Sequence, residues 1–386
     1  MKGYRRHRIL FGIFRFLFGW FIRLKFNFKY DRIDSDTPFM LVTNHNSNWD
    51  PLMLGIASKK HMYFVASEHV YRAGFWSVLL KWALSPIARM KGGTDANSAM
   101  AIIRTMRKGA NVCLFAEGNR SFNGLTYPIF PATGKLIRST GAKLITYKFI
   151  GGYFSDPRWS KKMRRGRMEG RIINEYSPEQ LRKLSGEEIN ELLRRDLHED
   201  AYETQKQNPV AYKGKDLAEH IQTALYICPK CRGLDTIKSK GNEFWCEKCS
   251  TRAAYTEYGD IVGDFGYDTV TAWDMWQQNQ LEQTAKTISE QKPIIDENME
   301  IRVLKERHGS RLVTQGRLYL YSEKLCCGSF EVKIDDIADI DMVSRSTLLF
   351  TTRTNHYEIK SKQVYCARKY IAFINILKSS IRESAG

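Results

Sequence analysis

Residues 41–55 of this 386-residue chain read LVTNHNSNWDPLMLG and place a histidine five positions before an aspartate. The apolar run just before them, Phe39–Val42, has the composition of a β-strand. Asp50 and Pro51 suit a helix start, with Asp50 as the N-cap and Pro51 at the first helical position. His45 would then lie in a strand-to-helix loop that can fold its ring back onto the Asp50 carboxylate.

A carboxylate that holds one ring nitrogen of a histidine fixes the tautomer and leaves the other nitrogen able to accept a proton. The stretch therefore predicts His45 as a general base with Asp50 as its partner. The alternative is structural: Asp50 is only a helix cap, and His45 is a loop residue that hydrogen-bonds to the backbone.

Length and charge indicate a multidomain chain with an anionic partner. The chain is long enough for two or three domains, and its 43% hydrophobic residues can fill a core. Lys and Arg number 60 against 42 Asp and Glu, a formal net charge of +18. This excess suits either nucleic acid or an acidic membrane. Much of it lies in residues 1–10 and 158–171, although a solvated surface would have the same composition.

Residues 8–23, RILFGIFRFLFGWFIR, predict an amphipathic helix. One narrow stripe of the helical wheel holds arginines and glycines, namely Arg8, Gly12, Arg15, Gly19 and Arg23. The stretch is shorter than the ~20 apolar residues that cross a bilayer, and no small-residue cleavage site follows it. We expect residues 1–30 to associate with the cytoplasmic face of a membrane, peripheral or monotopic, with arginines at the headgroups. The alternatives are an ordinary helix packed on the domain and a tilted or re-entrant insertion.

A second polar cluster follows another apolar run, Val112–Phe115, and reads Ala116-Glu117-Gly118-Asn119-Arg120-Ser121. Gly118 allows a tight turn, and Arg120 offers a planar fork suited to phosphate. Glu117 would organise the loop or hydrogen-bond a polar substrate group.

Two further basic residues accompany these blocks, Arg89 after the apolar segment 86–88 and Lys135 after Gly134. Apolar, strand-like runs alternate with helical stretches such as residues 95–108. This order indicates an α/β domain.

The blocks resemble those of the glycerolipid acyltransferase family, of the 1-acylglycerol-3-phosphate acyltransferase type. That family carries N-H-x4-D, an arginine block and F-P-E-G-T-R-S, in this order. Asn44, His45 and Asp50 match the first block in full, and Arg89 is kept from the second. Residues 115–121 keep Glu, Gly, Arg and Ser of the third block.

The chain also departs from the family pattern. Ala116 replaces proline and Asn119 replaces threonine in the third block, and LITYKFIGGY (144–153) stands where the family has an apolar run ending in proline. The similarity covers about residues 1–215. These departures leave a non-enzymatic lipid-binding adaptor on the same fold as the alternative to an enzyme.

The resemblance implies an acyltransferase domain over residues 31–220, with a mixed sheet and flanking helices. The implied enzyme is membrane-associated and moves a fatty acyl chain from acyl-CoA or acyl-carrier protein to a lysophospholipid hydroxyl. The expected acceptor is 1-acylglycerol-3-phosphate, which gives phosphatidic acid. His45 would take the hydroxyl proton, and Asp50 would orient the ring and stabilise the imidazolium.

Neither motif offers an evident serine or cysteine for an acyl-enzyme, so direct transfer is expected. Arg89 and Arg120 would hold the acceptor phosphate, with Lys135 as a weaker candidate. The whole predicted substrate-binding set is Asn44, Arg89, Glu117, Gly118, Arg120, Ser121 and Lys135.

Residues 228–249, CPKCRGLDTIKSKGNEFWCEKC, contain two C-x2-C pairs, Cys228, Cys231, Cys246 and Cys249. Two such pairs can bring four thiolates onto one tetrahedral Zn²⁺, whereas disulfides or a redox pair are the alternatives. Four thiolates fill the tetrahedral coordination of the zinc and leave no position for water. The zinc of the expected ribbon, residues 221–262, is therefore expected to be structural and not catalytic. A ribbon in a basic chain also suggests nucleic-acid binding, but its charges are mixed, and we expect no nucleic-acid partner.

The remaining cysteines, Cys113, Cys326, Cys327 and Cys366, are expected to be buried thiols.

The rest of the chain predicts a helical connector and a β-rich module. Residues 268–291 indicate one helix within the connector 263–296. Residues 297–386 then show strand-like segments, a hairpin over 347–361 that turns at Asn355, and a closing helix. The expected buried face of this helix is Val364, Ala367, Ile371, Ile374 and Leu377. The pattern resembles a pleckstrin-homology or GRAM-like module, without a signature motif, and would bind lipid headgroups or a partner, or pack on the enzyme.

Overall fold

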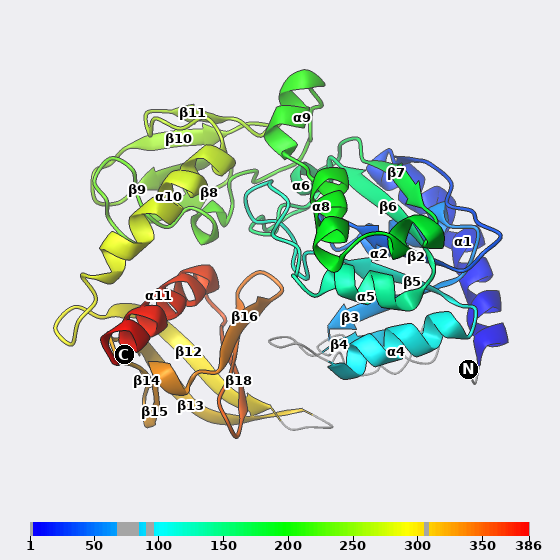
Figure 1. Cartoon of the computed structure of the whole chain (residues 1–386). Helices are drawn as coiled ribbons and strands as arrows, with labels where there is room; N and C mark the ends of the chain where they lie inside the picture. Colours follow the sequence, from blue (N-terminus) through cyan, green and yellow to red (C-terminus); the bar gives the residue numbers. More distant parts are fainter. Residues whose placement is uncertain (1–2, 68–84, 90–95, 305–308, 386) are drawn as a thin grey trace. The chain divides into compact units, whose positions relative to one another are not determined.

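The computed structural model describes residues 3–67, 85–89, 96–304 and 309–385, and these form two compact units. The first unit comprises Met1–Arg158, Lys162–Lys215 and Glu257–Gly259; the second comprises Trp159–Lys161, Asp216–Thr256 and Asp260–Gly386. The predicted zinc ribbon, connector and β-rich module all belong mainly to the second unit. Figure 1 shows the elements of both units along the chain.

The first unit is built on a seven-stranded sheet with the order β1-β7-β6-β2-β5-β3-β4. The strands are β1 (Lys29–Tyr30), β2 (Phe39–Thr43), β3 (Met62–Ser67), β4 (Ile87–Arg89), β5 (Asn111–Phe115), β6 (Lys143–Ile150) and β7 (Glu169–Tyr176). Neighbouring strands run parallel except β6 and β7, which are antiparallel. The mixed sheet confirms the α/β class. Every residue of β2 and β5 is buried, since helices cover both faces.

Helices cover both faces of this sheet (Figure 1). One face packs against α1 (Tyr4–Phe26) and α2 (Asp50–Ala57). The other packs against α4 (Ala96–Arg107), α5 (Thr133–Thr140), α7 (Pro178–Arg182) and α8 (Gly186–Leu197). Successive strand residues point to opposite faces of the sheet. Phe39 and Leu41 therefore pack in the core on the α1 side, and Met40 and Val42 pack in the core on the α4 side. The short helices α6 (Gly152–Ser155) and α9 (Ala201–Gln207) complete the unit.

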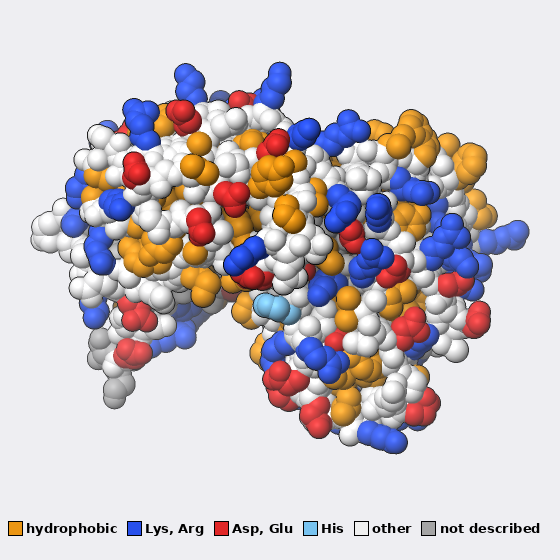
Figure 2. All heavy atoms as spheres, turned by 90° about the horizontal axis from the view of Figure 1, so that it is seen from above, with side chains coloured by type: hydrophobic (Ala, Val, Ile, Leu, Met, Phe, Trp, Pro, Cys, Tyr) orange, Lys and Arg blue, Asp and Glu red, His pale blue; other side chains and the backbone are white. Residues whose placement is uncertain are grey.

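Helix α1 has one buried stripe and one exposed apolar face. His7, Phe11, Ile22 and Phe26 are buried, and the helix packs on α2 near Gly55. The opposite face leaves large apolar side chains exposed, including Ile9, Ile13, Phe16, Leu17, Phe18, Trp20, Phe21 and Leu24. Figure 2 shows apolar side chains gathered beside lysines and arginines where α1 lies. None of the described helices has the length and apolar character that a membrane span requires.

The second unit begins with a four-stranded antiparallel sheet, ordered β11-β10-β9-β8. Its strands are β8 (Ile237–Lys240), β9 (Glu243–Cys246), β10 (Arg252–Tyr255) and β11 (Ile261–Gly263), after the 3-10 turn η2 (Ile221–Thr223). Helix α10 (Val270–Ala285) follows and confirms the helix predicted within residues 268–291. Its N-cap is Thr269, whose hydroxyl accepts the N–H of Ala272 at 3.0 Å.

A seven-stranded antiparallel sheet completes the second unit, ordered β15-β14-β13-β12-β18-β17-β16. Its elements are β12 (Ile294–Leu304), β13 (Ser310–Leu320), β14 (Lys324–Cys327), β15 (Phe330–Lys333), η3 (Ile334–Asp336), β16 (Asp339–Val343), β17 (Thr347–Thr351), β18 (His356–Ser361) and α11 (Ala367–Ala385). The predicted hairpin is confirmed, since β17 pairs with β18 and Thr352 bonds across the turn to Asn355.

Helix α11 closes the second unit through buried ion pairs as well as an apolar face. Lys369 is 1% exposed and pairs with Asp235, which precedes β8, and with Asp296 of β12. The predicted apolar face is correct for Ala367, Ile374 and Leu377, which are buried. Ile371 is only half-buried. Val364 lies before the helix begins and is 44% exposed, contrary to the prediction.

Candidate active site

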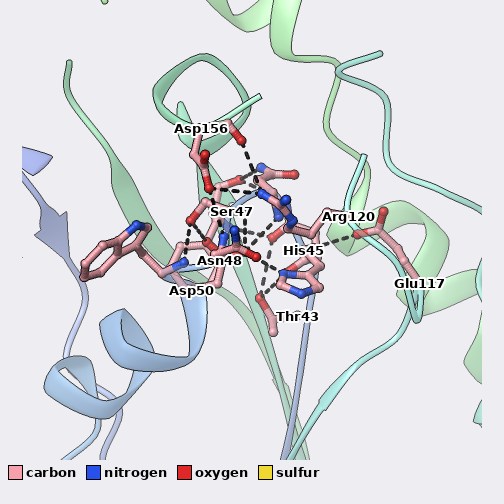
Figure 3. A network of polar contacts seen from close by, with 12 residues as sticks. Thr43, His45, Ser47, Asn48, Asp50, Glu117, Arg120 and Asp156 are labelled. Atoms are coloured by element: carbon pink, nitrogen blue, oxygen red, sulfur yellow. Dashed lines mark hydrogen bonds and ion pairs between the residues drawn. The ribbon is translucent and has the colours of Figure 1, made fainter. Parts of the chain in front are cut away.

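The carboxyl ends of three neighbouring strands meet at one edge of the first sheet. β2 lies between β5 and β6 and runs parallel to both. The chain leaves β2 toward His45 and leaves β5 toward Glu117. Ligand sites of α/β sheets lie outside the carboxyl ends of the strands. This topology brings the two predicted motifs together, as Figure 3 shows.

Asp50 is fully buried and accepts four hydrogen bonds. Its Oδ2 lies 2.9 Å from Nδ1 of His45, and accepts the N–H groups of Asn46 at 2.8 Å and Ser47 at 2.9 Å. Its Oδ1 accepts the hydroxyl of Ser47 at 2.7 Å. The helix begins at Asp50 with Trp49 as its N-cap, so the predicted capping role of Asp50 is wrong. The carboxylate instead organises the loop before the helix.

Asp50 holds the His45 ring in one orientation. With Oδ2 of Asp50 as the acceptor, Nδ1 carries the proton and Nε2 is left as the proton acceptor. The side chain keeps 20% exposure, and its ring packs on Phe115 with centroids 4.2 Å apart. Burial lowers the pKa of His45 below its usual 6.5, against the opposing effect of Asp50, and the charges of Arg120 and Arg158 lower the pKa further. The imidazole is therefore unprotonated at neutral pH.

Glu117 and Asn44 fasten the His45 loop to neighbouring strands. The two carboxylate oxygens of Glu117 accept the N–H groups of His45 at 2.8 Å and Tyr127 at 2.6 Å. Burial raises the pKa of Glu117 to about 8, although these two bonds act in the opposite direction. The amide of Asn44 donates to the carbonyl of Phe149 at 2.9 Å and accepts its N–H at 2.7 Å. Both side chains, predicted to bind substrate, bond to backbone.

The turn after β5 has the predicted conformation. Gly118 has φ +69°, a left-handed conformation that glycine adopts without steric cost, and its N–H bonds to Phe115. Ser121 is buried, its hydroxyl accepts the N–H of Gly124 at 2.8 Å, and its own N–H donates to the carbonyl of His45. The observed contacts of Ser121 therefore brace the loop.

The arginine of the third block is buried in an ion pair. Arg120 is 6% exposed, and its Nη1 lies 3.0 Å from Oδ2 of Asp156. Arg158 donates to the carbonyl of Arg120 at 3.2 Å, and its guanidinium lies over Phe122. A phosphate bound by Arg120 would share this guanidinium with Asp156. Phosphate binding by Arg120 stays a prediction.

The two other predicted phosphate-binding residues, Arg89 and Lys135, lie on different elements of the first unit. Arg89 ends β4 beside β3, and its side chain lies outside the described part of the structure. Lys135 is exposed in the first turn of α5, where its side chain packs beside Gly186 of α8. Of the predicted residues, the structure therefore assembles Asn44, His45, Asp50, Glu117, Gly118, Arg120 and Ser121.

Sequence reasoning missed Ser47, Asp156 and Arg158. Ser47 lies three residues before Asp50, and the spacing S-x-x-D before an apolar run is a known signal for such a bond. No sequence signal pointed to Asp156, because its ion pair with Arg120 joins two loops whose folding in space the sequence alone does not reveal.

The predicted cysteines form a candidate metal site. The sulfurs of Cys228, Cys231, Cys246 and Cys249 all lie within 4.8 Å of one another. The two C-x2-C turns share a left-handed residue and a closing hydrogen bond. Arg232 (φ 54°) and Ser250 (φ 61°) follow the second cysteine of each turn, and their N–H groups bond to the carbonyls of Cys228 and Cys246, both at 2.9 Å. Two matching turns thus present four thiols to one point.

Ser47→Ala tests how far the structure depends on the Asp50 network. We expect the free energy of unfolding to fall by about 1–3 kcal/mol, because the buried carboxylate loses a donor. Urea denaturation measures the change. Ser139→Ala is the control, because the exposed Ser139 hydroxyl bonds only to its own helix. Equal stability of both variants would show that the network is not stabilising.

One protein-family model matches the part of the chain that carries both motifs. Residues 25–149 match the family model described as Acyltransferase. Among solved structures, the chain is similar to the crystal structure of the 1-acyl-sn-glycerophosphate (LPA) acyltransferase PlsC from Thermotoga maritima. The identity is 19% and the TM-score 0.38, over 48% of this chain and 76% of that one. No curated protein matches the sequence. Residues 25–149, which hold His45 and Asp50, therefore match an acyltransferase domain.

Proposed function

We propose that this enzyme transfers a fatty acyl chain from the thioester of acyl-CoA or acyl-carrier protein to the hydroxyl of a lysophospholipid. The proposed acceptor is 1-acylglycerol-3-phosphate, and the product is phosphatidic acid. The observation that carries the proposal is the neutral, partly exposed His45, whose ring is fixed by a buried carboxylate within the acyltransferase domain.

His45 acts as the general base in this mechanism. Its Nε2 takes the proton of the acceptor hydroxyl while the hydroxyl oxygen attacks the thioester carbonyl. The tetrahedral intermediate then expels the thiolate, the C–S bond breaks, and the imidazolium returns the proton to sulfur. The products are an ester and a free thiol, and His45 is again neutral.

Asp50 and two arginines set the electrostatics of this step. Asp50 keeps Nδ1 of His45 protonated and stabilises the imidazolium that forms. The charges of Arg120 and Arg158 lie near enough to His45 to lower its pKa. Their positive charge also favours a phosphate-bearing acceptor and the oxyanion of the intermediate. We assign the acceptor phosphate to this region, with Arg120 and Arg89 as the proposed contacts.

Direct transfer fits the environment of the site serines and cysteine. The hydroxyl of Ser47 donates to Asp50 and is buried, and that of Ser121 accepts a backbone N–H inside the loop. Cys113 is buried in β5, and burial raises its pKa well above the usual value. These groups are unsuited to forming an acyl-enzyme.

The enzyme is proposed to work at a membrane surface through α1. The exposed apolar face of this helix and its flanking arginines suit insertion in the plane of the interface on the cytoplasmic side. A lysophospholipid could then pass to His45 without leaving the interface.

His45→Ala is expected to lower kcat by at least about 100-fold, because the general base is lost. Labelled acyl-CoA and 1-acylglycerol-3-phosphate, with detection of phosphatidic acid, measure the effect. His198→Ala, which changes an exposed histidine of the same unit, should keep full activity. Unchanged turnover in His45→Ala would refute the role. A correctly folded wild-type chain that binds lipid without turnover would favour the adaptor alternative.

The pH profile tests the state of His45. The base works only when neutral, so kcat/KM should fall as pH drops through the pKa of His45, which lies below 6.5. The acidic midpoint should therefore lie below pH 6.5. Arg158→Gln should move it to higher pH, because a positive charge that lowers the pKa is removed. A wild-type midpoint above pH 6.5 would contradict this description.

We propose that the four-cysteine site holds a structural Zn²⁺, since four thiolates in tetrahedral reach are the usual zinc set. Purified protein should contain stoichiometric zinc by elemental analysis. Cys246→Ser should lose the metal and lower the thermal stability of the second unit, whereas Cys326→Ser in β14 should keep both. Full zinc content in Cys246→Ser would exclude this site.

We further propose that the seven-stranded sheet and α11 form a pleckstrin-homology or GRAM-like module. The support is seven antiparallel strands closed by one C-terminal helix. Its ligand would be a lipid headgroup or a partner protein.

A further inference from the structure

A pocket of about 410 Å³ lies at the C-terminal end of α1, apart from the residues that surround His45. Its lining comes from two segments, Phe21, Leu24, Lys25 and Phe26 of α1 and Met163, Arg164 and Arg165 before β7. Four of these side chains are apolar and three are cationic. This composition suits an amphiphile that carries negative charge.

Lys25 is held in this pocket by aromatic rings. Its ammonium lies 4.3 Å from the ring centroid of Trp49 and 5.5 Å from those of both Phe21 and Phe26. Rings arranged in this way fix a cation in place without neutralising it. Lys25 is therefore positioned to meet an anion.

Arg165 faces the same pocket from the opposite wall and is exposed. Among the described residues, no carboxylate forms an ion pair with Lys25 or Arg165. Cations in the last turn of a helix often serve only to offset the helix dipole. That explanation covers Lys25 but not Arg165, which comes from another segment.

The two walls are joined rigidly. The N–H of Met168 donates to the carbonyl of Phe26 at 3.1 Å. The N–H of Lys29 donates to the carbonyl of Met168 at 2.9 Å. The indole N–H of Trp49 lies 3.2 Å from the sulfur of Met163. The backbone of Arg165 is held to Lys213 by hydrogen bonds in both directions. The pocket is thus preformed.

The pocket continues into the exposed apolar face of α1. Phe21 and Leu24 belong to both, and Leu17 and Trp20 extend the face along the helix at spacings of three and four residues. An acyl chain lying on this face would bring its headgroup to Lys25 and Arg165.

We propose that this pocket binds the phosphate headgroup of an anionic phospholipid of the bilayer, with the acyl chains along α1. The proposal rests on the proposed membrane association of α1 and not on acyl transfer. It assigns to the enzyme a lipid site that is separate from the reacting acceptor and selects anionic membranes.

The test is vesicle co-sedimentation of the full chain with the double variant Lys25→Gln/Arg165→Gln. The vesicles are phosphatidylcholine alone or phosphatidylcholine with phosphatidylglycerol. Each basic side chain at an anionic surface contributes about 1 kcal/mol, so losing two should weaken binding to anionic vesicles about 30-fold. The control variant is Arg107→Gln/Lys108→Gln, which removes the same charge from two exposed positions at the end of α4. It should change vesicle binding less than about threefold, because screening confines charge effects to about 8 Å.

A second readout locates the ligand. Monomeric dihexanoyl phosphatidylglycerol should change the tryptophan fluorescence of the wild type. Trp49→Phe should reduce this change, because Trp49 contacts Lys25, whereas Trp20 on the apolar face of α1 remains as a second reporter. Equal weakening in both double variants would overturn the pocket in favour of general surface charge. An equal fluorescence response to inorganic phosphate or coenzyme A would overturn the bilayer lipid as the ligand. Loss of binding to neutral vesicles as well would point to α1 insertion instead of headgroup selection.

Discussion

The buried carboxylate of Asp50 is the constraint on which the active site depends. A charged group without solvent is tolerated only when its oxygens are satisfied. Here one ring, two backbone N–H groups and one hydroxyl do so, all from residues 45–47. The same four bonds that satisfy the carboxylate also fix the loop and the tautomer of His45. The stability of the loop and the orientation of the His45 ring therefore depend on the same bonds.

Much of this site was predictable because its central contact is local. The N-H-x4-D spacing places His45 and Asp50 across a single turn, and their 2.9 Å contact confirms the predicted pairing. The apolar runs before both motifs likewise predicted the buried strands β2 and β5. A parallel arrangement of those strands then suffices to bring Glu117 beside His45.

The partners of the polar residues around that contact were not predictable, although organising the loop was one of the two roles expected for Glu117. Asn44 and Glu117 look like ligand-binding groups, yet they bond to the backbone of Phe149, His45 and Tyr127. Such bonds depend on strand order, which the sequence does not contain. Arg120 shows the same limit, because its partner Asp156 comes from a loop after β6. In the second unit the hairpin at Asn355 was predictable from local turn chemistry, but the burial of Lys369 was not.

The repeated geometry of the two cysteine turns restricts how this part of the chain can evolve. Arg232 and Ser250 occupy equivalent left-handed positions, a conformation that costs an ordinary residue roughly 1–2 kcal/mol. Glycine or asparagine at either position would relieve that cost, whereas valine, isoleucine or threonine would increase it. Substitutions tolerated in one turn should therefore be tolerated in its counterpart, so that natural variation in the two halves of the ribbon is expected to follow a common rule.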